Sequence, residues 1–361
     1  MHLYRFALPL ARRIELAGDT LDCRCGVVVE LHDETGNVGF GETSPLPGFS
    51  RESLDEAQQQ LIRLRYSVVS MNVPDHLEEL SGGFASWLGE HELYPSARFG
   101  FEAAVLALKA SRRGVPLERL ITDQPRATIT VNALLHGDET NILKRAEQLR
   151  RQGWSAFKLK VGGRATHDDV RLVRRVRRVI GPDAGLRLDA NRQFSADDFW
   201  QFAEGVRDCD IEYIEEPLSS LDDLKALSES PKPLLPLALD ESLQQINPVD
   251  LSRCHGVKAV VLKPTMLGLE RAAQFARAAA RRGAAAVLSS SYESCVGLTI
   301  LARLAAAFNV VDVPVGLDTG DCFETNLLPP LPTIGGRIVI DDLADIRNEI
   351  NRDLLAKITD A

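Results

Sequence analysis

Charged side chains recur at the ends of short apolar runs through the middle of the chain. Counted from the second lysine, the steps between them are 29, 26, 25 and 23 residues. One strand, one helix and two loops need about that length. A barrel of such units gathers its strand ends on one face, so three ammonium groups and three carboxylates should converge on one pocket. The six residues are Lys158, Lys160, Asp189, Glu215, Asp240 and Lys263.

The first two lysines are two positions apart, so in a strand they face the same side, about 6 to 7 Å apart. Repulsion between them and burial both lower the pKa of a lysine, which makes a neutral amine available as a base near pH 7. The alternative is a pair of solvated lysines at a sheet edge. Lysine is seldom buried without a reason, and the neighbouring strand ends favour a candidate base.

The three carboxylates provide hard oxygen ligands from successive strand ends. Mg²⁺ prefers few carboxylates and keeps positions open for a substrate oxygen; Mn²⁺ could replace it. Such an ion can bind a substrate carboxylate and stabilise the dianion formed when the adjacent carbon loses its proton. The alternative is that each carboxylate pairs with a lysine or arginine as a structural group. Taken together, the spacing and the lysines favour a metal site with a base beside it.

Strand and helix patterns alternate after about residue 125, with the run 128–135 as the first strand. Eight such units in about 190 residues favour an α/β fold, a (β/α)8-type barrel, over a doubly wound sheet. The predicted strands lie near residues 130, 158, 187, 213, 238, 261, 287 and 316.

Three segments are expected. Residues 1–115 read as a small α+β domain, residues 125–320 as the barrel, and residues 321–361 as a tail that packs back on the first domain.

Composition limits the possible partners. The net charge is −9, with 45% hydrophobic and 26% charged residues, which is typical of a globular protein. This charge argues against nucleic acid or an anionic membrane, although an anionic small molecule can still bind locally. There is no apolar run long enough for a membrane span and no signal-peptide pattern, and the six cysteines fit reduced thiols. We therefore expect a cytoplasmic protein.

Five stretches resemble the enolase superfamily. They match its branch with a K-x-K base motif and a lysine on the sixth strand, which includes o-succinylbenzoate synthases, dipeptide epimerases, muconate-lactonizing enzymes and N-acylamino acid racemases. Three further stretches are similar to the o-succinylbenzoate synthases of menaquinone biosynthesis: residues 41–50 (GETSPLPGFS), 289–294 (SSSYES) and 316–319 (GLDT). The superfamily stretches are 157–162 (FKLKVG), 188–191 (LDAN), 214–217 (IEEP), 239–242 (LDES) and 262–264 (LKP).

The resemblance implies an α+β capping domain on a modified barrel, completed by the C-terminal segment. It implies that the three carboxylates bind Mg²⁺, that Lys160 is the base with Lys158 as its electrostatic partner, and that Lys263 lies on the opposite face of the substrate. Main-chain groups at a helix N-terminus would receive a succinyl carboxylate, and Gly316 would leave room beside that arm. The substrate contacts implied are Pro47, Gly48 and Phe49 in a closing loop, Asn191, Ser289, Ser290, Ser291 and Gly316.

The reaction implied is syn dehydration of 2-succinyl-6-hydroxy-2,4-cyclohexadiene-1-carboxylate to o-succinylbenzoate. A dipeptide epimerase or N-acylamino acid racemase would use the same lysine pair. Dipeptide epimerases of this type usually carry Asp-x-Asp at the eighth strand, where this chain has Gly316 and Asp318. A third class, a non-catalytic scaffold stabilised by metal, would need no buried lysines. The oligomeric state is left open, with a monomer plausible.

Overall fold

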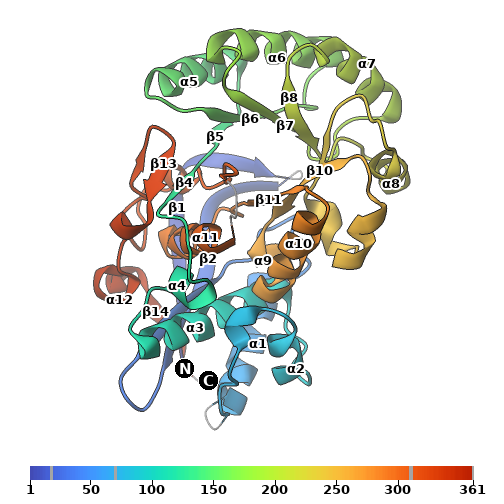
Figure 1. Cartoon of the computed structure of the whole chain (residues 1–361). Helices are drawn as coiled ribbons and strands as arrows, with labels where there is room; N and C mark the ends of the chain where they lie inside the picture. Colours follow the sequence, from blue (N-terminus) through green and yellow to red (C-terminus); the bar gives the residue numbers. More distant parts are fainter. Residues whose placement is uncertain (17–18, 69–70, 309–311, 360–361) are drawn as a thin grey trace.

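The computed structural model describes residues 1–16, 19–68, 71–308 and 312–359. It contains a four-stranded antiparallel sheet with helices at one end of the molecule and a curled, seven-stranded parallel sheet at the other (Figure 1). The division at residues 115, 125 and 320 stays a prediction. Among the described residues, no helix is both long and apolar enough to cross a membrane.

The antiparallel sheet joins the two ends of the chain. Its strand order is β14-β1-β2-β3, and β14 pairs with β1 through Tyr4 and Lys357. The turn between β2 and β3 forms at Asp33, whose carboxylate accepts the N–H groups of Thr35 and Asn37. The strands are β1 (His2–Leu16), β2 (Asp19–His32), β3 (Val38–Thr43) and β14 (Ala356–Lys357).

Helix α3 packs directly on β3, and glycine makes this approach possible. A Cβ atom at Gly41 would lie 1.8 Å from the carbonyl oxygen of Gly100, so any side chain there would force the elements apart. The helices of this region are α1 (Leu54–Val68), α2 (Gly83–Trp87), α3 (Pro95–Arg113) and α4 (Leu117–Ile121).

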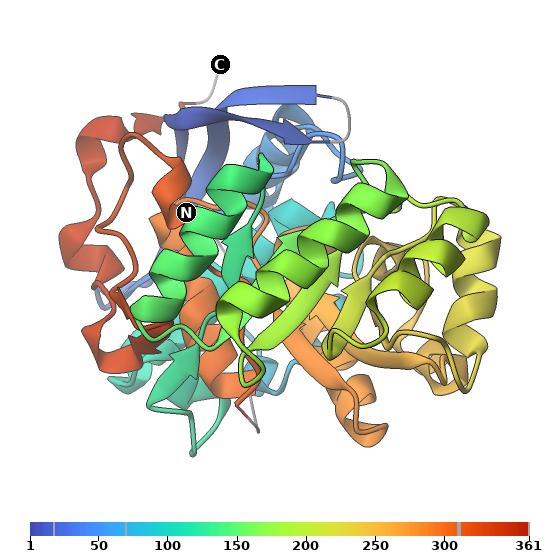
Figure 2. The same cartoon turned by 90° about the horizontal axis from the view of Figure 1, so that it is seen from above.

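The parallel sheet has the order β11-β10-β9-β8-β7-β6-β5, so consecutive strands are neighbours throughout. Its strands are almost wholly buried, as expected for strands covered on both faces, and the helices lie outside the curl (Figure 2). The strands are β5 (Ala133–Leu135), β6 (Ala156–Lys160), β7 (Gly185–Asp189), β8 (Ile211–Glu215), β9 (Leu237–Leu239), β10 (Val257–Leu262) and β11 (Ala285–Leu288).

Amphipathic helices connect these strands, and side chains cap three of them. Ser195 begins α7 by accepting the N–H of Asp198 at 3.1 Å, as an N-cap serine does. These helices are α5 (Glu139–Arg151), α6 (Thr166–Ile180), α7 (Ala196–Val206), α8 (Leu221–Glu229), α9 (Pro264–Leu267), α10 (Leu269–Arg281) and α11 (Cys295–Phe308). A further helix, α12 (Ile346–Glu349), lies in the C-terminal segment.

The prediction of eight similar strands is only partly right. The eighth is reduced to Val315 and Gly316, which bridge the two edges of the seven-stranded sheet. Asn132 donates to the carbonyl of Val315 at 2.9 Å, and Gly316 donates to Leu288 at 2.8 Å. Two residues are too few for a regular strand, so the curled sheet closes through isolated bridges.

The predicted first strand, residues 128–135, is also wrong as a single element. Its first part, β4 (Thr128–Thr130), pairs antiparallel with β13 (Arg337–Val339), which in turn pairs with β12 (Thr333–Ile334). Only β5 joins the parallel sheet. The returning chain near residue 337 takes the hydrogen bonds of β4, a long-range pairing that periodicity does not reveal.

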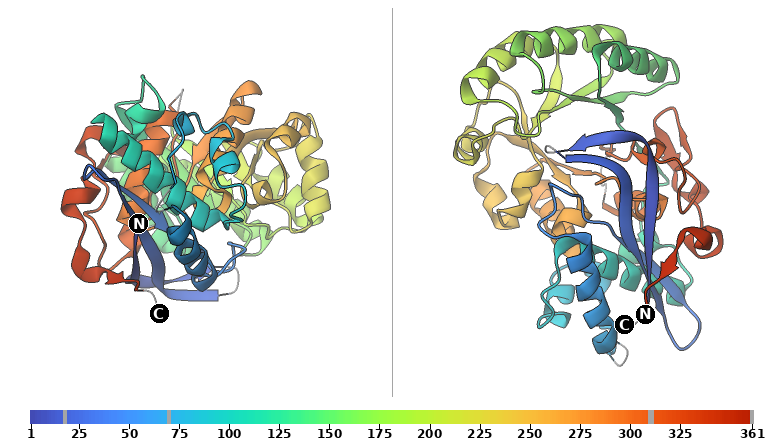
Figure 3. Two further views of the ribbon diagram at one scale, coloured as in Figure 1. Left: turned by 90° about the horizontal axis from the view of Figure 1, so that it is seen from below. Right: turned by 180° about the vertical axis from the view of Figure 1, so that it is seen from behind.

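Strands β1 and β2 extend across the hollow side of the curled sheet (Figure 3). An isolated bridge between Leu10 and Phe323 and a hydrogen bond from Arg24 to Tyr292 join this sheet to the loops beyond the parallel strands. The antiparallel sheet therefore lies against the edge where the charged strand ends gather.

Candidate active site

Strand register brings the predicted charged residues together at one edge of the parallel sheet. Lys160 pairs in register with Asp189, and Asp189 with Glu215. Asp240 follows β9 directly, and Lys263 follows β10.

Every one of the three carboxylates is held by a lysine. Lys158 Nζ lies 2.8 Å from Asp189 Oδ2 and 2.5 Å from Glu215 Oε2. Lys160 Nζ lies 2.7 Å from Asp189 Oδ2, and Lys263 Nζ lies 2.5 Å from Asp240 Oδ2. The six residues expected to converge do converge.

The lowering of pKa predicted for the lysine pair is wrong for Lys158. Burial disfavours the charge on Lys158, but Asp189 and Glu215 outweigh it and hold the pKa well above its ordinary value. Burial likewise opposes the charge on Lys263, where Asp240 prevails and raises the pKa. Attraction at salt-bridge distance exceeds both desolvation and the repulsion between lysines.

The pKa values of the three buried carboxylates do not all shift in the same direction. Burial raises the pKa of Glu215 to about 7, with the charge of Asp189 adding to the shift and Lys158 opposing it. Burial also raises the pKa of Asp240, against the effect of Lys263. Three ammonium groups near Asp189 overcome its burial and lower its pKa. The positive charge around Glu215 and Asp240 is thus too small to offset the effect of burial on their pKa values.

The donor chemistry of this edge fits a hard divalent cation, because three buried carboxylates lie on successive strand ends. Their present arrangement is not a metal-ligand cluster. Across residues 1–16, 19–68, 71–308 and 312–359, no group of three or more His, Cys, Asp or Glu side chains is placed to hold an ion. Lysine ammonium groups lie between the carboxylates instead.

Two cavities meet at Lys160. We call the smaller one, of about 60 Å³, the inner cavity; its lining includes Lys158, Asp189 and Lys263. We call the larger one, of about 690 Å³, the outer cavity; it is lined by the loop of Phe49 and by residues that follow β6, β7 and β9.

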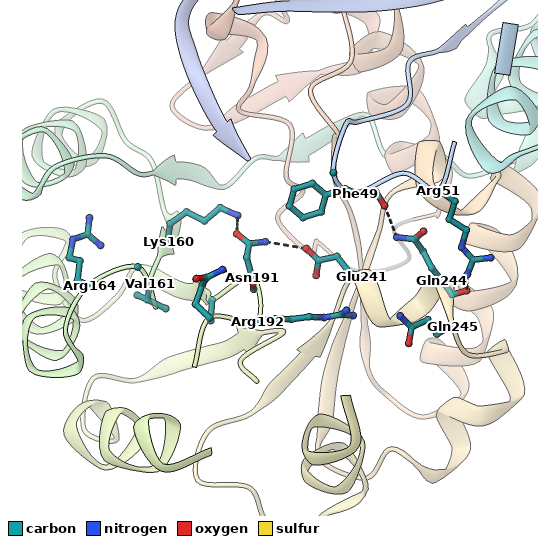
Figure 4. Close-up of a pocket in the computed structure, with 14 residues that line it drawn as sticks. Phe49, Arg51, Lys160, Val161, Arg164, Asn191, Arg192, Glu241, Gln244 and Gln245 are labelled. Atoms are coloured by element: carbon teal, nitrogen blue, oxygen red, sulfur yellow. Dashed lines mark hydrogen bonds between the residues drawn. The ribbon is translucent and has the colours of Figure 1, made fainter. Parts of the chain in front are cut away.

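Figure 4 shows the outer cavity. Lys160 Nζ donates to Asn191 Oδ1 at 2.5 Å, and the Asn191 amide donates to Glu241 at 3.1 Å. Across the cavity, Gln244 donates to the carbonyl of Phe49 at 3.3 Å, which joins the loop to the rim of the sheet.

The predicted substrate contacts divide between the cavities. Ser289, Ser290 and Gly316 line the inner cavity, and Gly48, Phe49 and Asn191 line the outer one. Within the described part of the chain, Pro47 and Ser291 line neither.

The main-chain contact predicted for a succinyl carboxylate stays a prediction, and in this structure the three N–H groups concerned have partners within the protein. The N–H of Ser289 donates to Leu262, that of Ser290 to Gly316, and that of Ser291 to Glu293. These groups also precede α11 rather than form its first turn. All three N–H groups are occupied, and the hydroxyls of Ser289 and Ser290 are hydrogen-bonded to Gly316 and Thr319.

Gly316 lies where no side chain fits without movement. A Cβ atom there would be 2.4 Å from Ser289 Oγ and 3.0 Å from Ser289 Cβ. Asp318, two residues on, also lines the inner cavity, and its carboxylate accepts the N–H of Leu134 at 2.9 Å and a hydrogen bond from Arg145 at 2.8 Å.

Sequence reasoning missed Arg24, which is 2% exposed. Its guanidinium donates to the carbonyls of Ser44 at 2.7 Å and Pro45 at 2.9 Å, and to those of Ser291 at 3.1 Å and Tyr292 at 3.0 Å. It therefore ties the start of the Phe49 loop to the wall of the inner cavity. The available signal was an arginine within an otherwise apolar stretch of β2.

Family comparisons agree with this geometry. A family model described as "Enolase C-terminal domain-like" matches residues 141–343, and one described as "MenC, N-terminal domain" matches residues 1–108. Together with the curled parallel sheet and its charged strand ends, these matches define the class, the enolase superfamily.

Curated relatives narrow the class. The o-succinylbenzoate synthase of Aliivibrio fischeri is 32% identical over 353 residues, which are 95% of this chain and 97% of that protein. Protein PHYLLO, chloroplastic, of Arabidopsis thaliana is 32% identical over 313 residues, which are 80% of this chain but 18% of that protein's length. The chain belongs to the o-succinylbenzoate synthase family and is an enzyme, a lyase of menaquinone biosynthesis.

Solved structures share the fold at lower identity. The L-Ala-D/L-Glu epimerase from Bacillus subtilis, a substrate-liganded complex, has a TM-score of 0.82 at 22% identity, covering 93% of this chain and 94% of that one. The dipeptide epimerase from Enterococcus faecalis V583, complexed with Mg and the dipeptide L-Leu-L-Tyr, has a TM-score of 0.79 at 20% identity, covering 96% and 97%.

Proposed function

We propose that the chain dehydrates 2-succinyl-6-hydroxy-2,4-cyclohexadiene-1-carboxylate to o-succinylbenzoate by syn elimination. The observation that carries the proposal is the placement of Lys160 and Lys263. Both line the inner cavity, and three strands separate β6, which carries the first, from β10, which precedes the second. A ring bound between them would meet an amine on each face.

Lys160 is the proposed base and acid. It takes the proton from the ring carbon that bears the carboxylate, and it returns that proton to the hydroxyl group leaving the same face. Before doing so, it must give up its contacts with Asp189 and Asn191. Its side chain is 34% exposed, against 8% for Lys158, so it has the greater room to move.

Lys263 stays protonated and stabilises the enediolate anion from the opposite face, by charge and by cation–π contact with the ring. Its raised pKa suits this role, because a permanent cation is needed and no proton is transferred. Lys158, which also lines the inner cavity, is the electrostatic partner of Lys160.

Asp189, Glu215 and Asp240 would hold Mg²⁺, or Mn²⁺ in its place. When bound, the ion would supply positive charge to the ring carboxylate and so stabilise the developing anion. The lysines that now fill this space would then turn toward the substrate.

Epimerisation of dipeptides is the second candidate, because the same lysine pair would serve it. Two observations disfavour it. Gly316 has no room for a side chain beside Ser289, and the carboxylate of Asp318 is already paired with Arg145. Neither position offers a carboxylate for a substrate ammonium group.

The test is an assay of the purified protein on the cyclohexadiene substrate, beside a panel of dipeptides followed by deuterium exchange in D2O. We expect rapid formation of o-succinylbenzoate, loss of turnover with excess chelator, and recovery with Mg²⁺ or Mn²⁺. Full turnover in metal-free protein would overturn the metal assignment. Rapid dipeptide exchange without dehydration would establish the second candidate instead.

A further inference from the structure

The inner cavity carries one carboxylate that the proposed mechanism does not use. Asp318 lines this cavity with Gly316 and Ser289, yet it lies outside the strand-end group that the lysines hold. Its side chain is only 15% exposed. The side of the inner cavity that carries Asp318, which we call the Asp318 wall, would therefore repel the second carboxylate of a substrate that has two.

Arg145 approaches this wall from behind. It belongs to α5, outside the sheet, and it lines neither cavity within the described residues. Its guanidinium donates to Asp318 Oδ2 at 2.8 Å and to the carbonyl of Leu134 at 3.2 Å, and a third nitrogen lies 3.5 Å from Asp321. The cation is thus fixed at three points and turned toward the carboxylate.

We propose that Arg145 is a specificity-determining residue, which neutralises Asp318 and so lets the inner cavity accept a dicarboxylate. The inference rests on the proposed function, since it assumes a substrate with a second carboxylate beside Gly316. Like charges that meet in a desolvated site repel strongly, and the ion pair removes this repulsion without adding a cation to the cavity surface. Arg145 acts through Asp318 and is a positioning residue for its charge.

A set of charge variants tests the proposal. In Arg145→Met, the KM for the cyclohexadiene substrate should rise at least about tenfold, while kcat changes much less. Arg145→Lys should keep most of the affinity because it keeps the charge. Adding Asp318→Asn to Arg145→Met should restore the KM, since the wall is neutral again and the side-chain oxygen can still accept the N–H of Leu134.

Arg174 offers a matched control. It donates to the carbonyl of Gly205 at 2.9 Å and pairs with Asp208 at 2.6 Å, so it repeats the contacts of Arg145 on the outside of the molecule. Arg174→Met should leave KM unchanged. If Arg145→Met does not fold, Asp318→Asn alone is informative, because it leaves Arg145 only the more distant and more exposed carboxylate of Asp321 and should tighten the binding of dianions.

Calorimetry separates this proposal from the proposed function. The probes are o-succinylbenzoate and its succinyl methyl ester, which carries one charge fewer. Arg145→Met should weaken the dianion about tenfold and the ester little. Equal losses for both probes, or no rescue by Asp318→Asn, would overturn the role of Arg145. Normal charge discrimination with no dehydration in the wild type would overturn the reaction and leave the charge role standing.

Discussion

Buried carboxylates occur in two regions of this molecule, and they are satisfied in different ways. Where the antiparallel sheet meets α11, Glu42 accepts the N–H groups of Ser294 and Gly297 and the hydroxyls of Ser44 and Ser294. At the ends of the parallel strands, lysine side chains hold Asp189 and Glu215, and Asp189 also accepts the N–H of Asn191 at 3.1 Å.

The difference shows which buried carboxylates can exchange their hydrogen-bond partners. Main-chain donors cannot leave without unfolding the segment that carries them, so Glu42 is committed to holding two parts of the fold together. A lysine ammonium can rotate away, so the strand-end carboxylates can exchange their partners for an ion and a substrate. Variants of the two regions should accordingly fail in different ways.

The largest expected effect is on turnover at the strand ends. Lys160→Ala should reduce kcat by at least about 10² to 10⁴-fold, the usual contribution of a positioned acid–base group. Lys160→Arg should do no better, because a guanidinium stays protonated. The melting temperature should change little, since the side chain is one-third exposed. Substantial dehydration by Lys160→Ala would contradict the mechanism.

The next effect concerns the shape of the inner cavity. Gly316→Asp should lower kcat/KM by about 100-fold, because the new side chain crowds Ser289 and repels an anionic substrate. The control is Gly163→Ala, which lies on the outer cavity with no atom within 4 Å of its future Cβ. A Gly316→Asp variant with normal kcat/KM would show that this residue does not face the substrate.

Glu42→Gln should change stability rather than chemistry. Replacing a carboxylate that accepts four hydrogen bonds should lower the free energy of unfolding by about 1 to 3 kcal/mol, measured by denaturant titration. The kcat of the folded enzyme should stay within about twofold. A loss of kcat at unchanged stability would erase the contrast between the two regions.

The last expected effect is a pH dependence of stability at Glu102, a fully buried residue on α3. Burial raises its pKa to about 7, with Arg98 opposing the shift. The folded state therefore holds a proton that the unfolded state releases near pH 4.5, and this stabilisation is lost as pH rises through 7. Between pH 5 and 8 the wild type should lose about 2 to 3 kcal/mol of stability relative to Glu102→Gln. Parallel stability curves for the two proteins would contradict this assignment.

The strand-end charges could be predicted because each depends on a local pattern. An apolar run followed by Asp189 or Glu215 predicts a strand and the residue at which it ends. The regular spacing of such runs predicts which strands are adjacent. Three features depended on distant contacts. Arg24 bonds to Tyr292, 268 residues away, Arg145 pairs with Asp318, and β4 pairs with β13; no local pattern indicates these partners.

The sign of the lysine pKa shift failed for another reason. The sequence shows that Lys158 and Lys160 lie side by side, and repulsion follows from that alone. It does not show that two carboxylates approach the ammonium of Lys158 within 2.8 Å. Distances of a few ångströms decide the balance between attraction and repulsion of charges. The fold sets these distances, and a local sequence pattern does not show them.

The pairing of β14 with β1 has a consequence for synthesis on the ribosome. Tyr4 emerges 353 residues before its partner Lys357, a delay of roughly 20 to 70 seconds at ordinary rates of translation. Throughout that time, the outer edge of β1 at Tyr4 and Arg5 has unpaired main-chain groups that a second nascent chain could bind. The last strand to be made is the one that ends this exposure. Ribosome stalling just before β14 is made should therefore promote aggregation.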